Sequence, residues 1–256
     1  MTAPLFVNSY ALRPGTSLNS REVSGKRPMH ARQRAGDTVR ALSTIDIFSD
    51  LGVDDLAKLG AQVRRMACEA GRLLYVPEER GEALFLLSEG TVQLYRLSQR
   101  GRKLMVARLQ AGTFFGAIVP MGQETYQTFA ETVDKCSLYV LSRVDAERLL
   151  REKPEVALRT VVVLGERLRR LEQRLEGMAF QQIPARLASL LLQLADEQGD
   201  NLVLGYSHQD LADMLGTYRE TISDTLNNFR ADGLVRSGRK QIVLEEREQL
   251  QILAET

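Results

Sequence analysis

Apolar residues between positions 61 and 141 occur in short runs that are separated by turn signals. Runs at residues 83–87, 91–95 and 104–107 alternate with turns at residues 79–81, 89–90, 100–101 and 111–112, each of which contains glycine. Short apolar runs spaced about ten residues apart, with glycine at the turns, are typical of antiparallel strands in a barrel or roll. The pattern therefore predicts an antiparallel β-roll, with two short amphipathic helices before it between residues 38 and 58.

A helical period replaces the strand pattern from residue 142 onward. Ser142, with Asp145 three residues later, predicts the N-cap of a helix over residues 142–152. Pro154 then begins the longest helical pattern of the chain, in a position where proline is tolerated. The apolar positions of this long helix alternate in steps of four and three: Ala157, Val161, Leu164, Leu168, Leu171, Leu175 and Met178.

This spacing forms a heptad seam about three heptads long on an otherwise charged helix. Such a narrow apolar seam needs a surface to cover it. That surface is either the same helix of a second copy in a two-fold dimer or the chain's own roll. We favour the dimer. The residues expected to pair the two copies are Val161, Leu164, Leu168, Leu171, Leu175 and Met178.

Residues 207–244 predict a winged helix-turn-helix. Ser207 is a good cap for a first helix, and Gly216 breaks that helix at a tight turn. Thr217 is expected to cap a second helix, whose buried stripe is Ile222, Leu226 and Phe229. That helix ends near residue 233, and two short apolar runs after it predict a hairpin, the wing.

The second helix carries residue types suited to reading DNA from its first turn. Arg219 can donate to guanine and Glu220 can accept from cytosine, and Ser223 and Asp224 share their face. A second group of polar or cationic residues is expected to contact phosphates and fix the register: Ser207, His208, Gln209, Thr217, Tyr218, Thr221, Arg239 and Lys240. The alternative is a ligand-sensing module whose winged helix contacts another protein.

Charge is unevenly distributed, although the net charge is only +1. Residues 1–40 hold seven arginine and lysine residues against two acidic ones, whereas residues 181–256 hold seven against twelve. The first segment is rich in Ser, Arg, Gly and Pro, so residues 1–36 are expected to be a disordered basic tail, solvated or touching DNA, with Met29 as an alternative start. The acidic C-terminal third argues against DNA binding unless the arginines gather on one face.

Several function classes lack the residues that they need. Residues 41–141 contain no histidine for a metal site, and the chain has no phosphate-binding loop or hydrolase motif, so we expect no enzyme activity and no cofactor. Only Cys68 and Cys136 are present, which is no disulfide framework and too few for an iron–sulfur cluster. A buried cysteine acting as a small apolar side chain is the default, with a redox role left open. No signal peptide or membrane span is visible, which predicts a cytoplasmic protein without a membrane partner.

Together these features resemble the cyclic-AMP receptor protein/FNR family of transcriptional regulators over roughly residues 38–250. The strongest likeness lies in residues 207–212 and 216–223, which read SHQDLA and GTYRETIS. The resemblance implies an α+β protein: an antiparallel, cyclic-nucleotide-binding-like β-roll (a double-stranded β-helix) at residues 37–152, a dimerisation helix at 153–180 and a winged helix-turn-helix at 181–256. It also implies a homodimer on a two-fold symmetric duplex, with RNA polymerase as protein partner.

Two departures from the family qualify this resemblance. Cyclic-AMP binders of the family have glutamate after the pocket glycine and, about ten residues later, arginine and serine for the phosphate. Here Ala117 follows Gly116, and residues 123–129 include no cation. A buried phosphate without a cation is costly, so the regulator is expected to need no effector or to respond to another small molecule or a redox signal. The residues of a possible effector pocket are Gly116, Ile118, Tyr126 and Thr128.

The second departure is Asp224, which stands where family members usually have an arginine that contacts DNA. An aspartate there repels phosphate and can at best accept from a base amino group. We therefore expect an operator that differs from the usual half-site, together with modest affinity and a shallow salt dependence.

Overall fold

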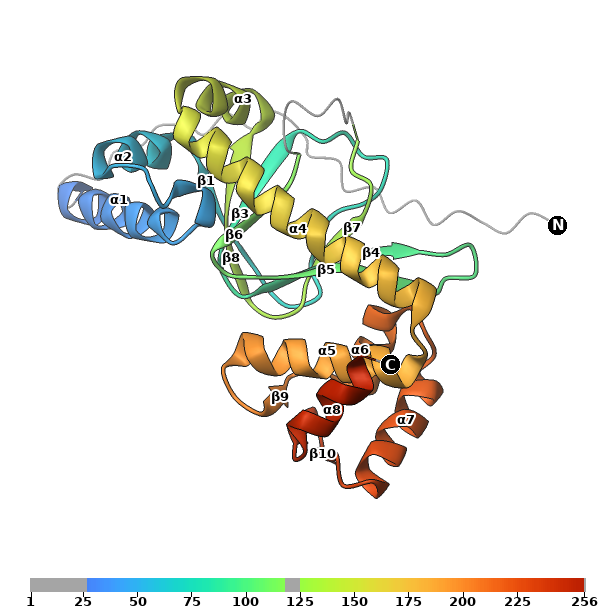
Figure 1. The fold of residues 1–256 in the computed structure, drawn as a ribbon. Coiled ribbons are helices and arrows are strands. Elements are labelled where there is room, and N and C mark those ends of the chain that lie inside the picture. The colour runs from blue at the N-terminus through green and yellow to red at the C-terminus, as the bar shows by residue number, and fades with distance from the viewer. Residues whose placement is uncertain (1–26, 118–124, 256) are drawn as a thin grey trace.

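The computed structural model describes residues 27–117 and 125–255 of the 256-residue chain. Figure 1 shows a β-roll with small helices beside it, a long helix running diagonally away from the roll, and a second body of helices and short strands at the end of that helix. The fold class is the one predicted.

The chain enters the roll through helices that begin earlier than expected. Helix α1 spans Arg27–Ser43, the 3₁₀ turn η1 spans Asp46–Phe48, and α2 spans Val53–Gln62. Residues 27–36, assigned to the tail, are therefore helical, and the amphipathic helix expected near residue 38 is only the last part of α1. Leu42 of α1 packs with Leu56 and Leu59 of α2. Residues 31–35, which precede this anchor, are alanine, arginine and glutamine. These residue types have high helix propensity, so the helix extends toward the N-terminus once Leu42 is anchored.

The roll consists of two four-stranded antiparallel sheets. The first sheet has the order β1 (Arg64–Cys68), β8 (Cys136–Ser142), β3 (Ala83–Glu89), β6 (Thr113–Gly116). The second has the order β2 (Leu73–Tyr75), β7 (Phe129–Thr132), β4 (Thr91–Leu97), β5 (Lys103–Gln110).

Strand β3 is buried on both faces, which explains its continuous apolar run. Leu84 and Leu86 belong to a core beneath the helices, whereas Phe85 and Leu87 belong to a second core inside the roll. Successive side chains of a strand point to opposite faces. One strand therefore separates the two cores.

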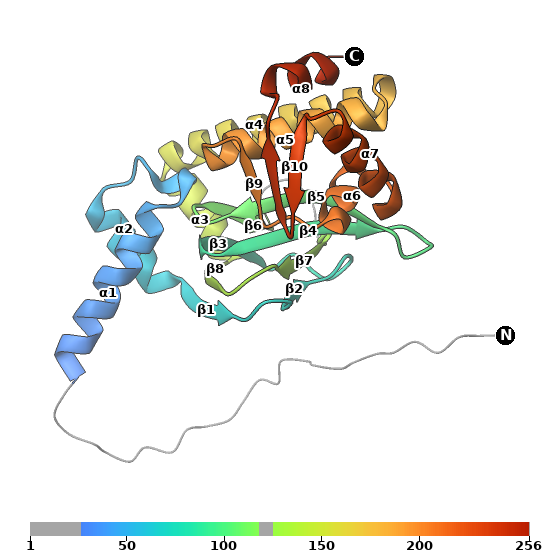
Figure 2. The same ribbon diagram turned by 90° about the horizontal axis from the view of Figure 1, so that it is seen from below.

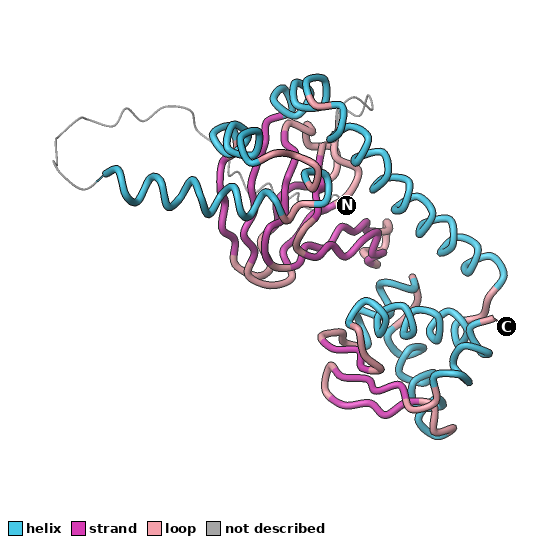
Figure 3. The backbone as a smooth tube through the Cα atoms, turned by 60° about the vertical axis from the view of Figure 1, so that its left-hand side comes forward, coloured by secondary structure: helices cyan, strands magenta, loops and turns pink. Residues whose placement is uncertain are grey.

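Helices α3 (Arg143–Glu152) and α4 (Pro154–Phe180) follow the last strand. The Ser142 hydroxyl accepts from the Asp145 amide at 3.2 Å, as the capping pattern predicted. Val156 and Thr160 of α4 are buried against the roll, and the rest of α4 crosses to the second body, as Figure 3 shows from another side. None of the helices between residues 27 and 255 has the length and apolar character that a bilayer crossing requires.

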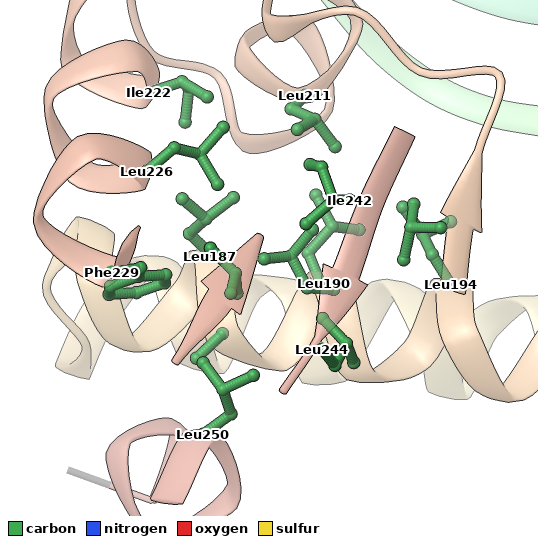
Figure 4. Close-up of a cluster of buried hydrophobic side chains, with 14 of the residues drawn as sticks. Leu187, Leu190, Leu194, Leu211, Ile222, Leu226, Phe229, Ile242, Leu244 and Leu250 are labelled. Atoms are coloured by element: carbon green, nitrogen blue, oxygen red, sulfur yellow. The ribbon is translucent and has the colours of Figure 1, made fainter. Parts of the chain in front are cut away.

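The second body is built around one apolar core. Its elements are α5 (Ile183–Gln198), β9 (Leu202–Leu204), α6 (His208–Leu215), α7 (Arg219–Ala231), β10 (Val235–Gly238), β11 (Gln241–Leu244) and α8 (Arg247–Ala254). Figure 4 shows Leu187 and Leu190 of α5 facing Ile222, Leu226 and Phe229 of α7. Helix α8, which the sequence analysis did not predict, covers this core from below with the fully buried Leu250.

Candidate nucleic-acid interface

Helix α6 begins with the cap that the sequence predicted. The Ser207 hydroxyl accepts from the Asp210 amide at 3.1 Å, and the Asp210 carboxylate accepts from the Ser207 amide at 2.8 Å. This reciprocal pair is a capping box, which satisfies two amides at the helix start. The Ser207 hydroxyl also donates to Asp210 at 2.6 Å, so a phosphate contact from that hydroxyl would compete with the cap.

Helix α7 begins later than predicted. Gly216 has a φ of 66°, as a tight turn requires, but Thr217 is not the cap of α7. The Thr217 amide instead donates to the Ala212 carbonyl at 3.0 Å, so Thr217 completes the end of α6. Tyr218 stands at the N-cap position of α7 and provides no side-chain cap. The amides of the first turn are therefore left to other acceptors.

The exposed face of α7 holds three of the four residues expected to read bases. Arg219, Glu220 and Asp224 are exposed, while Ile222, Leu226 and Phe229 are buried as predicted. The fourth residue, Ser223, is half-buried, and its hydroxyl lies 2.8 Å from Nδ1 of His208. This bond joins α6 to α7, so Ser223 and His208 hold the two helices together besides any contact with DNA.

A cationic cleft lies between the start of both helices and the wing. It measures about 520 Å³. Cations from both ends of the motif line it: Arg219 from α7, and Arg239 and Lys240 from the wing turn. None of the ten described residues that line it is acidic; the other seven are Tyr206, Ser207, His208, Gln209, Gly238, Gln241 and Ile242. The acidic balance of this part of the chain therefore does not extend to this cleft. Arg236, by contrast, pairs with Glu245 at 3.0 Å.

The remaining expected phosphate contacts are placed at the edges of this face. Gln209 is exposed and its amide donates to Asp213 at 2.7 Å. Thr217 and Thr221 are half-buried, and Tyr218 is 63% exposed. The fold brings most of the predicted set to one side of the winged helix, and their contacts with DNA stay predictions.

The roll contacts the helix-turn-helix directly, a contact that was not predicted from the sequence. Arg102, in the turn between β4 and β5, lies over the Tyr218 ring at 5.4 Å, and Arg108 of β5 lies over the Tyr206 ring at 4.3 Å. A side-chain carbon added at Gly216 would lie 3.3 Å from Leu104. Figure 2 shows α6 beside the β4 and β5 strands. The turn between α6 and α7 is therefore seated on β5.

Two half-buried arginines add hydrogen bonds to this junction. Arg174 of α4 donates to the carbonyls of Val106 and Met214, each at 2.9 Å, and Arg186 of α5 donates to the Leu215 carbonyl at 2.5 Å. Burial lowers the pKa of both guanidinium groups, and Arg186 lowers that of Arg174 further. Carbonyls at a helix C-terminus attract cations, so both arginines stabilise the C-terminal end of α6.

An apolar stripe remains uncovered along α4. Five residues of the predicted seam are exposed: Val161, Leu168, Leu171, Leu175 and Met178. The sixth, Leu164, differs from the prediction because it packs against the core beneath its own roll. Helical geometry accounts for this difference, since Leu164 lies on the side of α4 nearest to buried Thr160. Three further exposed apolar residues were not predicted: Leu158, Val162 and Phe180.

Aromatic rings pack against one another in the core inside the roll, near the expected effector pocket. Tyr126 stacks on Tyr75 at 3.8 Å, and Phe85 stacks on Phe115 at 5.1 Å. The Tyr126 hydroxyl donates to the Ala83 carbonyl at 3.2 Å. Burial raises the pKa of Tyr75 to about 12, against a hydrogen bond with Thr128 that lowers it.

Gly116 is fixed by close packing in the same region. Its φ is 101°, and an added side-chain carbon would lie 2.7 Å from the Ala83 carbonyl oxygen. Only glycine fits this position. Ile118, the remaining residue of the expected pocket, lies outside the described residues.

Comparison with known proteins identifies both bodies. Residues 65–153 match the cyclic nucleotide-binding domain, and residues 185–253 match the Crp-like helix-turn-helix domain. The cyclic AMP receptor protein of Thermus thermophilus is 28% identical over 208 residues, covering 81% of this chain and 96% of that protein. The global nitrogen regulator of Synechococcus elongatus is 27% identical over 210 residues, covering 79% and 92%.

Solved structures show the same arrangement. A CooA mutant from Carboxydothermus hydrogenoformans matches with a TM-score of 0.67 at 26% identity, covering 76% of this chain and 88% of that one. FixK2 from Bradyrhizobium japonicum matches with a TM-score of 0.67 at 24% identity, covering 75% and 96%. The second match bears on the fold alone.

Proposed function

The chain belongs to the CRP/FNR family of transcriptional regulators, and we propose that it binds a two-fold symmetric DNA site as a homodimer without needing cyclic AMP. Two copies pair through α4, and their α7 helices enter successive major grooves about 34 Å apart. RNA polymerase is the proposed protein partner, and the cytoplasm the proposed location. The proposed domains are a β-roll at residues 37–152, a dimerisation helix at residues 153–180 and a winged helix-turn-helix at residues 181–256.

The observation that carries the DNA-binding part is the exposed first turn of α7 beside the cationic cleft. Arg219 and Glu220 stand at the end of the helix that enters the groove, where they can reach base edges. Arg239 and Lys240 reach the same cleft from the wing, where phosphates of the adjoining backbone would lie. Base readers and phosphate binders thus share one side of the domain.

The uncovered stripe on α4 supports the homodimer. Leu168 is 58% exposed and Leu175 is 66% exposed, one heptad apart on the same face. A second copy related by a two-fold axis presents the same stripe in return, so each copy covers the other's apolar side chains. Gly165 has open space around it on this face and lets a partner helix approach.

The filled interior of the roll supports independence from cyclic AMP. The stacked rings of Tyr75 and Tyr126 occupy the space on the inner side of β2 and β7. The described residues after Tyr126, namely Gln127, Thr128 and Phe129, supply no cation for a cyclic phosphate. These three residues therefore lack the side-chain cation that a cyclic phosphate would need from them.

The test is selection of bound sites from a random duplex library by the full-length protein, with and without cyclic AMP. We expect the same palindromic site in both arms. Arg219→Ala should relax preference at one base pair of each half-site and weaken binding by roughly tenfold or more, since a bidentate arginine–guanine contact contributes about 1–3 kcal/mol.

The matched control is Arg230→Ala. Arg230 is an exposed arginine at the far end of the same helix, and its guanidinium donates to the Asn227 side chain. It should leave site preference unchanged. Absence of sequence-selective duplex binding would favour the protein-contact alternative, and a site selected only with cyclic AMP would refute independence from that nucleotide.

A further inference from the structure

The two cysteines of the chain face each other across a pair of strands. Cys68 is the last residue of β1 and Cys136 is the first residue of β8, and they are direct partners in the antiparallel register. Directly opposed residues place their side chains on the same face of a sheet. Both side chains accordingly belong to the core inside the roll. Residues 68 positions apart in the sequence thus become neighbours.

The geometry of such a pair suits a disulfide. Opposed residues of antiparallel strands have Cα atoms about 4.5–5.5 Å apart, within the roughly 4.4–6.8 Å that a disulfide spans. Because the pair ends the β1–β8 ladder, small backbone shifts there disturb few other pairings. The chain contains only these two cysteines, so an intramolecular disulfide has one possible connectivity.

The surroundings of Cys136 confine its sulfur. The Cys136 thiol donates to the Thr91 carbonyl at 3.3 Å, and a side-chain carbon added at Gly90 would lie 2.7 Å from the Cys136 sulfur. If the thiol leaves that bond, the Thr91 carbonyl keeps the Val133 amide as a donor at 2.8 Å. The loss is therefore tolerable, because no buried carbonyl is left without a partner there.

We propose that Cys68 and Cys136 are a modification site, at which hydrogen peroxide converts the two thiols into a reversible disulfide joining β1 to β8. A small oxidant is required because Cys68 is only 7% exposed and Cys136 only 2%. Peroxide is close to water in size, whereas a bulky disulfide such as oxidised glutathione does not reach either sulfur.

Cys68 reacts first, because it is the more exposed of the two and the charge of Arg72 favours its thiolate. The thiolate attacks one peroxide oxygen, the O–O bond breaks, and hydroxide leaves and takes up a proton to give water. Cys68 is then a sulfenic acid. The Cys136 sulfur attacks the Cys68 sulfur, the S–S bond forms and the S–O bond breaks, and the hydroxyl leaves as water with the Cys136 proton. Two thiols and one peroxide give one disulfide and two waters.

Burial makes this step slow at neutral pH and its product long-lived. It raises the pKa of Cys68, and it raises the pKa of Cys136 to about 11, so thiolate is scarce at pH 7. The same burial shields the finished disulfide from reductants. The site therefore responds to sustained rather than brief exposure to peroxide.

The experiment treats the reduced full-length protein with hydrogen peroxide, removes the peroxide, unfolds the protein in guanidinium chloride with N-ethylmaleimide present to block the remaining thiols, and digests it with trypsin without reduction. Cleavage after Arg65, Arg72, Lys135 and Arg143 gives peptides 66–72 and 136–143, with one cysteine each. We expect these two peptides linked, two hydrogens lighter than their sum, and released by dithiothreitol. The oxidised protein should melt roughly 5–10 °C higher, because the disulfide closes a long loop.

Cys68→Ala is the matched control and should give no linked peptide. The main measurement needs only the wild-type protein, so it holds even if a variant fails to fold. Recovery of both peptides as maleimide adducts after long exposure at pH 8.5 would overturn the proposal. Oxidation to sulfinic acids without a link, or a disulfide between two chains, would also overturn it.

Discussion

Arg174 donates from Nη2 to the main-chain carbonyl of Met214 at 2.9 Å, and this bond connects the long helix α4 to the last turn of α6. The same guanidinium donates to Val106 of β5, so one side chain holds three elements together. A half-buried cation whose partners are backbone carbonyls keeps these hydrogen bonds only while those elements stay in place. The position of the helix-turn-helix relative to the roll therefore depends on α4.

Replacing Arg174 with methionine should loosen the seat of α6 on β5. Methionine keeps most of the side-chain length but removes donors to two elements, and bonds from a charged donor contribute about 1.5–3 kcal/mol. Hydrogen–deuterium exchange of residues 208–215 should accelerate by about tenfold. Arg169→Met, at an exposed position of the same helix, should change nothing; equal exchange in both variants would show that the Arg174 bonds do not hold α6.

Charges placed in the α4 stripe should separate the two copies. Leu168→Glu with Leu175→Glu puts like charges where each copy is expected to cover the other. Light scattering should then report the 28.7 kDa mass of one chain instead of twice that mass. The control is Arg169→Gln with Gln173→Glu, which makes the same charge change at exposed positions beside the stripe. A wild-type protein of single-chain mass at micromolar concentration would contradict the proposed dimer.

The carboxyl group of Asp213 should make the protein less stable at neutral pH than at acidic pH. Burial raises its pKa above 3.8, although Gln209 and Lys103 oppose the shift. A raised pKa means that the folded state favours the protonated form, so the associated stability is present below the unfolded pKa and lost as pH rises through the folded one. Asp213→Asn removes this loss and can still accept from Gln209.

Thermal melts across pH check this expectation. The Asp213→Asn variant should melt above the wild type at pH 7, and the difference should shrink to nothing below pH 3.8. The exposed Asp224→Asn serves as control and should not raise the melting temperature. A lower melting temperature for Asp213→Asn at pH 7 would mean that the carboxylate makes a favourable contact, most directly with Lys103.

Asp224 should weaken DNA binding through its charge. It is exposed on the face of α7 that is proposed to enter the groove. Asp224→Arg should raise affinity for the selected site and steepen the plot of log affinity against log salt by about two for a dimer, one added phosphate contact per copy. Asp232→Arg makes the same change beyond the far end of α7. An equal effect of both variants would indicate nonspecific attraction instead of a contact at this position.

The sequence predicts best where neighbours along the chain decide the structure. Ser207 and Asp210 form their capping box within four residues, and the tight turn after α6 needs a positive φ, which Gly216 adopts at little cost. The apolar run of β3 likewise reports burial on both faces. Helix α8 was missed because its one fully buried residue, Leu250, gives no periodic pattern by itself.

Contacts between distant segments were not predictable from local pattern. Thr217 has the residue type of a cap, yet its amide is used by α6. The seam of α4 predicts one apolar face, but the roll covers Leu164 on its own side, and only the three-dimensional position of the roll decides this. The seating of Tyr218 under Arg102 and the pairing of Cys68 with Cys136 also depend on the closed fold.

The described core inside the roll is rich in aromatic side chains. Tyr75, Phe115 and Tyr126 occupy the space, while the strand pairing around them leaves the main chain of an antiparallel roll intact. Exchanging two such rings for small residues would vacate volume without altering any strand. The capacity of this domain to accept or refuse a ligand can therefore change by a few substitutions during evolution, while the helix-turn-helix domain is inherited unchanged.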